Sequence, residues 1–252
     1  MRLSSLQNPQ IKAWAALRTA SGRRQQGLFL AEGEHLAGEA LQAGAAQALL
    51  VDEERQEQYE KYLNTPVPVY LMPPHVLQKV CDAKTPQGIL AVCPIPAQQE
   101  LGSLGGRLVA LNGVQDPGNA GTIWRTMDAA GFTGLVMDEK SADPFSPKAL
   151  RASMGAVFRV PVYRCASLAA ALAPLAGCAF LAGDLQGEDF FARAPVQGDL
   201  CLLIGNEGQG LDEETQAMAT HRLKLPMPGG AESLNAAVAA AIMMYDVVRR
   251  NG

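Results

Sequence analysis

The chain has 252 residues, of which 48% are hydrophobic and 18% are charged, a composition typical of a folded protein and not of a disordered one. A net charge of −4 argues against a protein that coats nucleic acid by bulk charge, and leaves room only for a local basic patch. The sequence has no apolar run of membrane-spanning length and no signal-peptide stretch, and its 5 cysteines are never spaced C-x-x-C, so we expect a cytoplasmic protein with free, buried thiols.

Residues 1–95 are predicted to form one domain. Asn8 followed by Pro9 is a typical helix start, and apolar residues then recur at helical spacing until residue 22. From residue 28 onward, short apolar strands alternate with helices, including a charged helix over 53–63. This alternation is typical of a compact α/β domain.

Residues 96–106 are predicted to form a linker, because proline and glycine punctuate them and they have no apolar face. Beyond it, the strands are continuous apolar runs separated by helical segments, as expected for a sheet that is covered on both faces. The regular alternation predicts a mostly parallel sheet over 107–252. We therefore expect an α/β protein with a smaller first domain and a larger second one.

Three glycine-bearing loops in this second half, 116–131, 204–214 and 225–241, each follow a strand and precede a helix. Ligands bind at such positions in parallel α/β sheets. None of the loops has the G-x-G-x-x-G or G-x-x-x-x-G-K-[ST] pattern, the chain has no G-x-S-x-G, and its 3 histidines are isolated. Dinucleotide, P-loop, serine-hydrolase and metal chemistry are therefore disfavoured, and we expect no metal.

The same loops, PGNAGTIWRTMDAAG, IGNEGQG and LPMPGGAESLNAAVAAA, resemble motifs one, two and three of the SpoU/TrmH family of RNA 2′-O-ribose methyltransferases, in the SPOUT superfamily. The earlier stretch LFLAEGEHLAGEAL is similar to the substrate-binding domain that many members carry. The resemblance implies methyl transfer from S-adenosyl-L-methionine to a ribose 2′-hydroxyl of structured RNA, ribosomal RNA first and transfer RNA second. It also implies a deep trefoil knot in the second domain, RNA binding by the first, and a homodimer formed through the second.

The resemblance assigns the site residues as well. The methyl donor would lie against loop backbone and apolar side chains at Gly183, Ile204, Gly205, Leu225, Met227 and Leu234. The catalytic set would be Asn119, Arg125, Glu207, Ser233 and Asn235.

Arg125 corresponds to the family's catalytic arginine. A guanidinium keeps its proton in nearly every protein site, so we expect Arg125 to clamp a phosphate and stabilise the developing alkoxide. Its neighbours Ile123 and Trp124 suggest a partly enclosed position. Asn119 would orient Arg125 or the ribose, and Glu207 would fix Arg125 or Asn235 by a charge-assisted hydrogen bond.

Basic side chains in the opening helix and between motifs one and two are candidate phosphate contacts, with ordinary solvated charges as the alternative. They are Lys12, Arg18, Arg23, Arg24, Lys148 and Arg151. Two other functions stay open: a non-catalytic RNA-binding or ribosome-assembly factor, and a methyltransferase for a small molecule or a protein.

Overall fold

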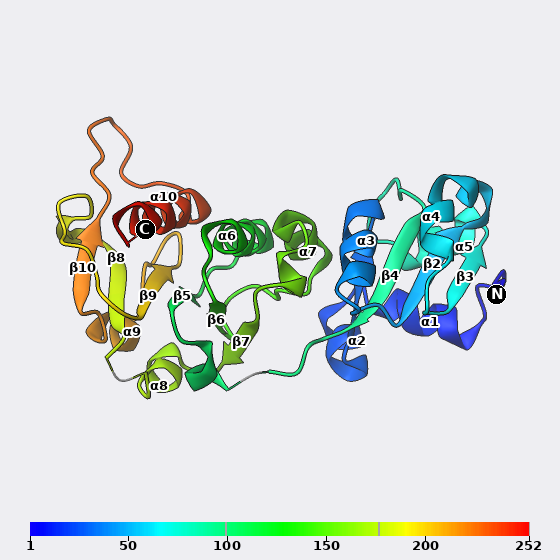
Figure 1. The fold of residues 1–252 in the computed structure, drawn as a ribbon, viewed down its shortest axis with the longest axis horizontal. Coiled ribbons are helices and arrows are strands. Elements are labelled where there is room, and N and C mark those ends of the chain that lie inside the picture. The colour runs from blue at the N-terminus through cyan, green and yellow to red at the C-terminus, as the bar shows by residue number, and fades with distance from the viewer. Residues whose placement is uncertain (99, 176, 252) are drawn as a thin grey trace. The chain divides into compact units, whose positions relative to one another are not determined.

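The computed structural model describes residues 1–98, 100–175 and 177–251. Contacts divide the chain into two compact units, and the first consists of Met1–Pro96 together with Asp143–Phe158. The second consists of Ala97–Ala142 and Arg159–Gly252 (Figure 1). Residues 143–158 therefore belong to the first unit although they lie in the second half of the sequence.

The first unit opens with two helices where the apolar spacing predicts one. Helix α1 (Pro9–Ala16) begins as expected, with the Asn8 side chain accepting the N–H of Gln10 at 2.8 Å. It ends at Ala16, and the Thr19 hydroxyl caps a second helix, α2 (Ala20–Gln26). A Cβ on Gly22 would lie 2.0 Å from the Ala16 carbonyl oxygen, so glycine permits the tight corner between the helices. The prediction of one helix to residue 22 is wrong for this reason.

The sheet of the first unit has the strand order β1-β4-β2-β3. Strand β4 is antiparallel to both β1 and β2, and β2 is parallel to β3. The strands are β1 (Leu28–Glu32), β2 (Ala48–Asp52), β3 (Val69–Met72) and β4 (Ile89–Pro94). The charged helix expected over 53–63 is instead a series of short turns, η1 (Glu53–Arg55), η2 (Glu57–Tyr59) and α4 (Glu60–Leu63).

Helices pack on this sheet through apolar residues. Helices α1 and α5 (Pro74–Val80) share one buried cluster with the strands, to which Trp14, Leu50 and Leu77 belong. Helix α3 (Glu34–Gln42) contacts β1 and β4. Helix α7 (Pro147–Ser153), from the late segment of this unit, contacts β1, and the short η4 (Ala156–Phe158) follows it.

The second unit contains a six-stranded sheet in the described residues, with the order β10-β8-β9-β5-β6-β7 and every neighbouring pair parallel. The central strands are buried almost throughout, as the continuous apolar runs predict. The strands are β5 (Arg107–Asn112), β6 (Gly134–Asp138), β7 (Val162–Cys165), β8 (Ala179–Asp189), β9 (Leu200–Gly205) and β10 (His221–Lys224). The expected mostly parallel sheet is confirmed.

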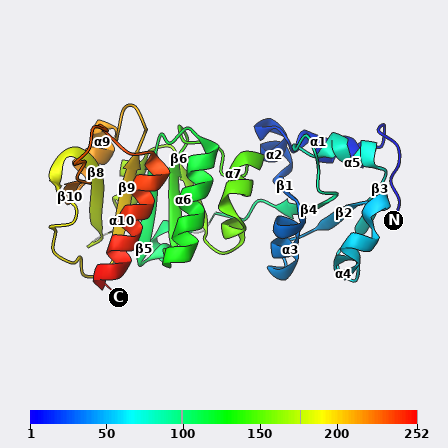
Figure 2. The ribbon, with the colours of Figure 1, turned by 90° about the horizontal axis from the view of Figure 1, so that it is seen from above.

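Helices cover both faces of this sheet. Figures 1 and 2 show α6 (Pro117–Ala130) and α10 (Ala236–Asn251) side by side on one face. Figure 1 shows α8 (Leu168–Leu172) and α9 (Glu213–Ala217) on the other. The short helix η3 (Leu101–Leu104) precedes β5, within the stretch expected to be a linker. The trefoil knot stays a prediction.

The cysteines and the helix lengths bear on two expectations for the whole chain. The cysteines are free, and burial raises the pKa of Cys93 to about 12, which makes it an unreactive thiol. The buried cysteines are Cys81, Cys93, Cys178 and Cys201. Every helix in the described part of the chain falls short of the length and apolarity that a bilayer crossing requires.

Candidate active site

Helix α6 sets the position of the first motif. It begins after Asp116, whose carboxylate accepts the N–H groups of Gly118 at 2.6 Å and Asn119 at 3.0 Å. Pro117 occupies the first helical position, where a missing N–H costs nothing. This cap fixes Asn119 in the first turn of the helix.

Asn119 joins the three motifs through its side-chain amide. Its Nδ2 donates to Glu207 Oε1 at 2.7 Å, and its Oδ1 accepts from Asn235 Nδ2 at 3.0 Å. Asn235 in turn accepts the N–H of Ala237 at 2.9 Å and so caps α10. The structure therefore brings one predicted catalytic residue from each motif together. Glu207 was expected to bind Arg125 or Asn235. Among the described residues it instead accepts a hydrogen bond from Asn119.

Arg125 lies outside this cluster. It follows Asn119 by about one and two-thirds turns of helix, which places it about 240° away around the axis of α6. Its side chain is exposed, although Ile123 and Trp124 beside it are buried. It has no hydrogen-bond or ion-pair partner among the described residues. The expected enclosure is wrong, because only the flanking side chains face the sheet.

A partly buried polar network joins the carboxyl ends of β5 and β6 to the start of α9. Asn112 Nδ2 donates to Asp138 Oδ2 at 3.1 Å and to Asp212 Oδ2 at 2.8 Å, and Asn112 Oδ1 accepts the N–H of Asp212 at 2.7 Å. Burial alone would raise the pKa of Asp212, but hydrogen bonds from Asn112 and Thr215 outweigh it and lower the pKa. This network was not predicted from the sequence, although the polar residues Asn112 and Asp138 at the ends of two apolar strands were a signal for it.

A second support shapes the glycine-rich loop of motif two. Asn206 Nδ2 donates to the carbonyl of Gly113 at 2.8 Å, and its backbone exchanges hydrogen bonds with Gly210. A Cβ on Gly205 would lie 2.3 Å from the carbonyl carbon of Gly210, so only glycine fits there. These contacts hold the short loop that presents Glu207 to Asn119.

A cavity of about 390 Å³ lies beside the cluster, within the range of small-molecule sites. Ser233 and Glu207 line it, together with apolar side chains such as Leu203 and Met243. The walls also include each residue expected to hold the methyl donor: Gly183, Ile204, Gly205, Leu225, Met227 and Leu234. Apolar walls beside strand-end backbone suit a flat, partly apolar cofactor. No cluster of metal-ligating side chains occurs among the described residues.

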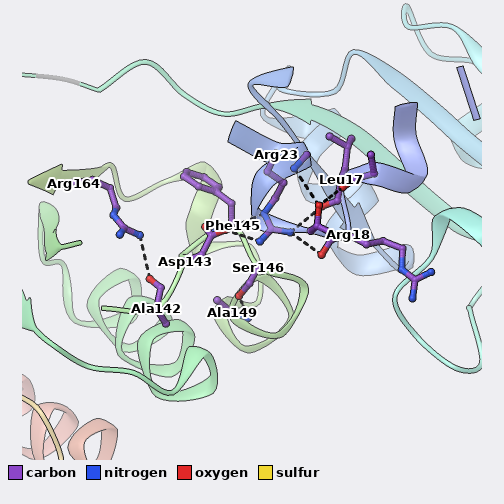
Figure 3. Close-up of polar contacts among 12 residues, drawn as sticks. Leu17, Arg18, Arg23, Ala142, Asp143, Phe145, Ser146, Ala149 and Arg164 are labelled. Atoms are coloured by element: carbon purple, nitrogen blue, oxygen red, sulfur yellow. Dashed lines mark hydrogen bonds and ion pairs between the residues drawn. The ribbon is translucent and has the colours of Figure 1, made fainter. Parts of the chain in front are cut away.

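Arg23 is buried and does not offer a surface contact for RNA. Its side chain is 4% exposed and pairs with Asp143 at 2.5 Å. Figure 3 shows its guanidinium between Asp143 and the carbonyl oxygens of Leu17 and Arg18, at 2.8 and 3.1 Å. This burial leaves no surface for a phosphate, so the expectation of an RNA contact is corrected for this residue.

The other basic residues expected to contact RNA are exposed and all lie in the first unit. Lys12 Nζ donates to Gln7 Oε1 at 2.6 Å, and Arg151 pairs with Asp82 at 3.0 Å. Both partners are at the surface or half-buried, which leaves the cationic heads accessible. The exposed set is Lys12, Arg18, Arg24, Lys148 and Arg151.

Comparisons with known proteins agree with the fold and with the motif loops. Residues 106–245 match the SpoU rRNA Methylase family, and residues 8–91 match the MRM3-like substrate binding domain. The chain belongs to the SpoU rRNA methylase family, which confirms the resemblance seen in its three motifs.

Individual relatives match over nearly their whole length. The chain is 36% identical to the 23S rRNA (guanosine(2553)-2′-O)-methyltransferase RlmP of Bacillus subtilis, over 97% of this chain and 98% of that protein. An AdoMet-bound rRNA methyltransferase from Sinorhizobium meliloti has a TM-score of 0.86 at 32% identity, covering 99% of this chain and 97% of that one. The SpoU methyltransferase AviRb from Streptomyces viridochromogenes, in complex with AdoMet, has a TM-score of 0.86 at 29% identity, covering 97% and 98%.

Proposed function

We propose that the chain transfers a methyl group from S-adenosyl-L-methionine to a ribose 2′-hydroxyl of structured RNA, with ribosomal RNA as the preferred substrate and transfer RNA as the second. The observation that carries the proposal is the junction of the three motifs at Asn119, beside a cavity that every expected donor-site residue lines. The name of the Bacillus subtilis relative supports both the reaction and the substrate. Ribosomal RNA as substrate implies a cytoplasmic location.

The donor would occupy the cavity without a metal. Backbone groups of Gly183, Ile204 and Gly205 would form hydrogen bonds with the polar edges of the donor. The side chains of Leu225, Met227 and Leu234 would pack against its apolar faces. The AdoMet-bound structures of two relatives support S-adenosylmethionine as the donor. When bound, the donor supplies the electrophilic methyl group.

The chain's own residues would bind and orient the ribose. Arg125, exposed and without a partner among the described residues, is free to grip the phosphate next to the target. Its charge would stabilise the 2′-oxygen as that oxygen loses its proton and forms the new bond to carbon. Asn119, held by Glu207 and Asn235, would orient the ribose, and Ser233 would line the donor side.

The first unit would bind RNA through its exposed basic residues, since residues 8–91 match a substrate-binding domain. The second unit would form the homodimer. Two apolar side chains on the outer face of α10 are about half exposed, Val238 at 48% and Tyr245 at 53%, and their spacing of seven places them on the same side of the helix. Sedimentation equilibrium of the full chain tests this assembly.

Labelled methyl transfer tests the reaction. The protein is incubated with S-adenosylmethionine carrying an isotope-labelled methyl group and with total RNA from cells that lack the protein. An Arg125→Ala variant is treated in the same way as the control. Alkali-resistant 2′-O-methyl positions in the RNA are then mapped. We expect one labelled ribose that is absent with the variant. Donor binding without transfer to RNA or ribosomal particles would contradict the proposal and favour a non-catalytic RNA-binding factor.

A further inference from the structure

Strand β8 carries a bulge at the wall of the cavity. Leu181 and Ala182 of β8 pair with His221 and Arg222 of β10. The next residue of β10, Leu223, pairs with Glu188. Residues 183–187 of β8 therefore have no register partner on β10 and form a bulge within the strand, between two consecutive residues of β10. The start of this bulge, 183–185, lines the cavity.

Asp184 ties the bulge to two other elements. Its Oδ2 accepts from Arg222 of β10, at 2.5 Å from both Nε and Nη2, and from Gln216 of α9 at 3.1 Å. Its Oδ1 accepts the N–H of Gln186 at 2.8 Å. The carboxylate is only 10% exposed, and both oxygens are engaged by the protein itself. Asp184 is therefore suited to hold the wall in place and not to bind the donor directly.

A backbone contact secures the far end of the bulge. A Cβ on Gly187 would lie 2.4 Å from the backbone nitrogen of Leu223 and 2.5 Å from the carbonyl oxygen of Arg222, so the two backbones touch at this point. This contact fixes where the bulge rejoins the sheet but does not reach its start. At the start of the bulge, 183–185, it is the side chain of Asp184 that is hydrogen-bonded to other elements, α9 and β10.

The geometry points to the Asp184–Arg222 ion pair as a positioning element that holds the 183–187 bulge in the shape that binds the methyl donor. The inference rests on the proposed function, because it assigns the cavity to S-adenosylmethionine. Arg222 touches the wall only from behind, since it does not line the cavity, whereas Asp184 and Gln216 do. Loss of the pair would let the wall sample other conformations, and apparent donor affinity falls in proportion to the competent fraction.

The protonation state of Asp184 agrees with this role. The N–H of Gln186 lowers the pKa of the carboxyl below its ordinary value, and hydrogen bonds from Arg222 and Gln216 add to this effect. The carboxyl is therefore charged at neutral pH, and its bonds to the guanidinium are charge-assisted.

Donor binding by the full-length protein tests the inference. Dissociation constants for S-adenosylmethionine are measured by calorimetry for wild type, Arg222→Ala, Arg222→Lys and Asp184→Asn, with kcat at saturating donor and the melting temperature of each. We expect Arg222→Ala to raise the dissociation constant about tenfold, as when the competent state falls to about a tenth of the population. Arg222→Lys should recover part of the loss. The values of kcat and melting temperature should stay near wild type, because Arg222 is more than half exposed and is not a member of the Asn119, Glu207 and Asn235 cluster.

Arg159→Ala serves as the matched control, because it removes another ion pair of the same unit, with Asp128 at 2.9 Å, that does not line the cavity. Its donor affinity should equal that of wild type. The double variant Asp184→Asn, Arg222→Ala should bind no more weakly than the weaker single variant, since both changes remove one interaction.

Unchanged donor affinity in both Arg222→Ala and Asp184→Asn would overturn the inference and leave the proposed function intact. Weakened binding that merely follows a lowered melting temperature, with no recovery in Arg222→Lys, would also overturn it, since it would indicate general destabilisation. A wild-type protein without measurable donor binding would instead overturn the proposed function, and the inference with it.

Discussion

Arg23 and Asp143 lie 120 positions apart in the sequence and form a partly buried ion pair, with Nη2 and Oδ2 at 2.5 Å. The same guanidinium donates to the carbonyls of Leu17 and Arg18 at the corner between α1 and α2. Asp143 opens the 143–158 segment, which also packs by its aromatic rings, with Phe29 and Phe145 at 5.3 Å between centroids. One arginine therefore fastens this late segment to the opening helices of the first unit.

Replacement of Arg23 should destabilise the first unit. Arg23→Ala leaves Asp143 without its partner and two carbonyl oxygens without a donor. Breaking a buried pair by removing one member costs about 3–5 kcal/mol, and the 30% exposure of Asp143 places the expected loss at the lower end. Urea unfolding, followed by circular dichroism, measures the free energy of unfolding. A loss under about 1 kcal/mol, the range of exposed pairs, would show that the pair does not fasten the segment.

Arg24, the next residue, should act on RNA and not on stability. Its side chain is exposed, and we assign it to the phosphate-contacting set. Arg24→Ala should weaken RNA binding at every salt concentration and lower the slope of log K against log salt by about 1, as loss of one phosphate contact does. Fluorescence anisotropy of a labelled rRNA fragment measures both quantities. Gln25→Ala, an exposed neutral neighbour, is the control, and an equal effect there would contradict the assignment.

These two neighbours show where sequence reasoning ends. Charge spacing finds both arginines, but no local signal separates a buried guanidinium from an exposed one, because the partner of Arg23 lies in a distant segment. The same limit applies to 143–158: the alternation of strands and helices predicts a helical segment there, and periodicity does not say which sheet the segment covers.

Other features were predictable because their causes are local. Helix caps at Asn8 and at Asp116 depend on a few adjacent residues, and the continuous apolar strands report a sheet covered on both faces. The motif loops that the sequence shows include residues that line the cavity, such as Gly205 and Leu234. The Asn119–Glu207 contact was not foreseen, because a loop's position relative to a helix is set by tertiary supports such as Asn206.

Removal of the Asn119 amide should impair the reaction more than donor binding. Asn119→Ala breaks the links to Glu207 and Asn235, and Asn119 does not line the cavity. We expect kcat to fall on the order of a hundredfold, as when a reacting group is misplaced. The donor dissociation constant should change less than about threefold. Thr122→Ala, an exposed change one turn along α6, is the control; equal losses in both variants would point to damage of the helix instead.

Arg125→Lys tests whether the planar guanidinium is needed or only its charge. Lysine keeps the charge but presents a single ammonium, which cannot grip a phosphate with two parallel hydrogen bonds. We expect kcat/KM for RNA to fall on the order of tenfold or more, the effect of one lost charge-assisted hydrogen bond. Full activity in the lysine variant would contradict the proposed phosphate clamp.

The C-terminal helix should show acid-dependent stability through Asp246, which binds Arg193 at 3.3 Å and Arg250 at 2.7 Å. Burial acts to raise the pKa of Asp246, but hydrogen bonds from Arg249 and Arg250 outweigh it and lower the pKa. A lowered folded-state pKa means that the carboxylate stabilises the fold above its unfolded pKa of about 4, and that this stability is lost as the pH falls through the folded value.

Asp246→Asn should therefore cost about 3 kcal/mol near neutral pH, because the Arg193 side chain, 3% exposed, keeps a buried charge without its partner. The difference in free energy of unfolding between variant and wild type should begin to narrow below about pH 4, where the unfolded wild type becomes protonated, and should close as the pH falls through the lowered folded-state pKa of Asp246. Urea unfolding across a pH series measures this difference. Arg249→Ala, which removes an arginine that is 66% exposed, should cost under about 1 kcal/mol. If the difference in free energy of unfolding between Asp246→Asn and wild type does not vary with pH, the packing of the Asp246 side chain, and not its charge, stabilises the helix.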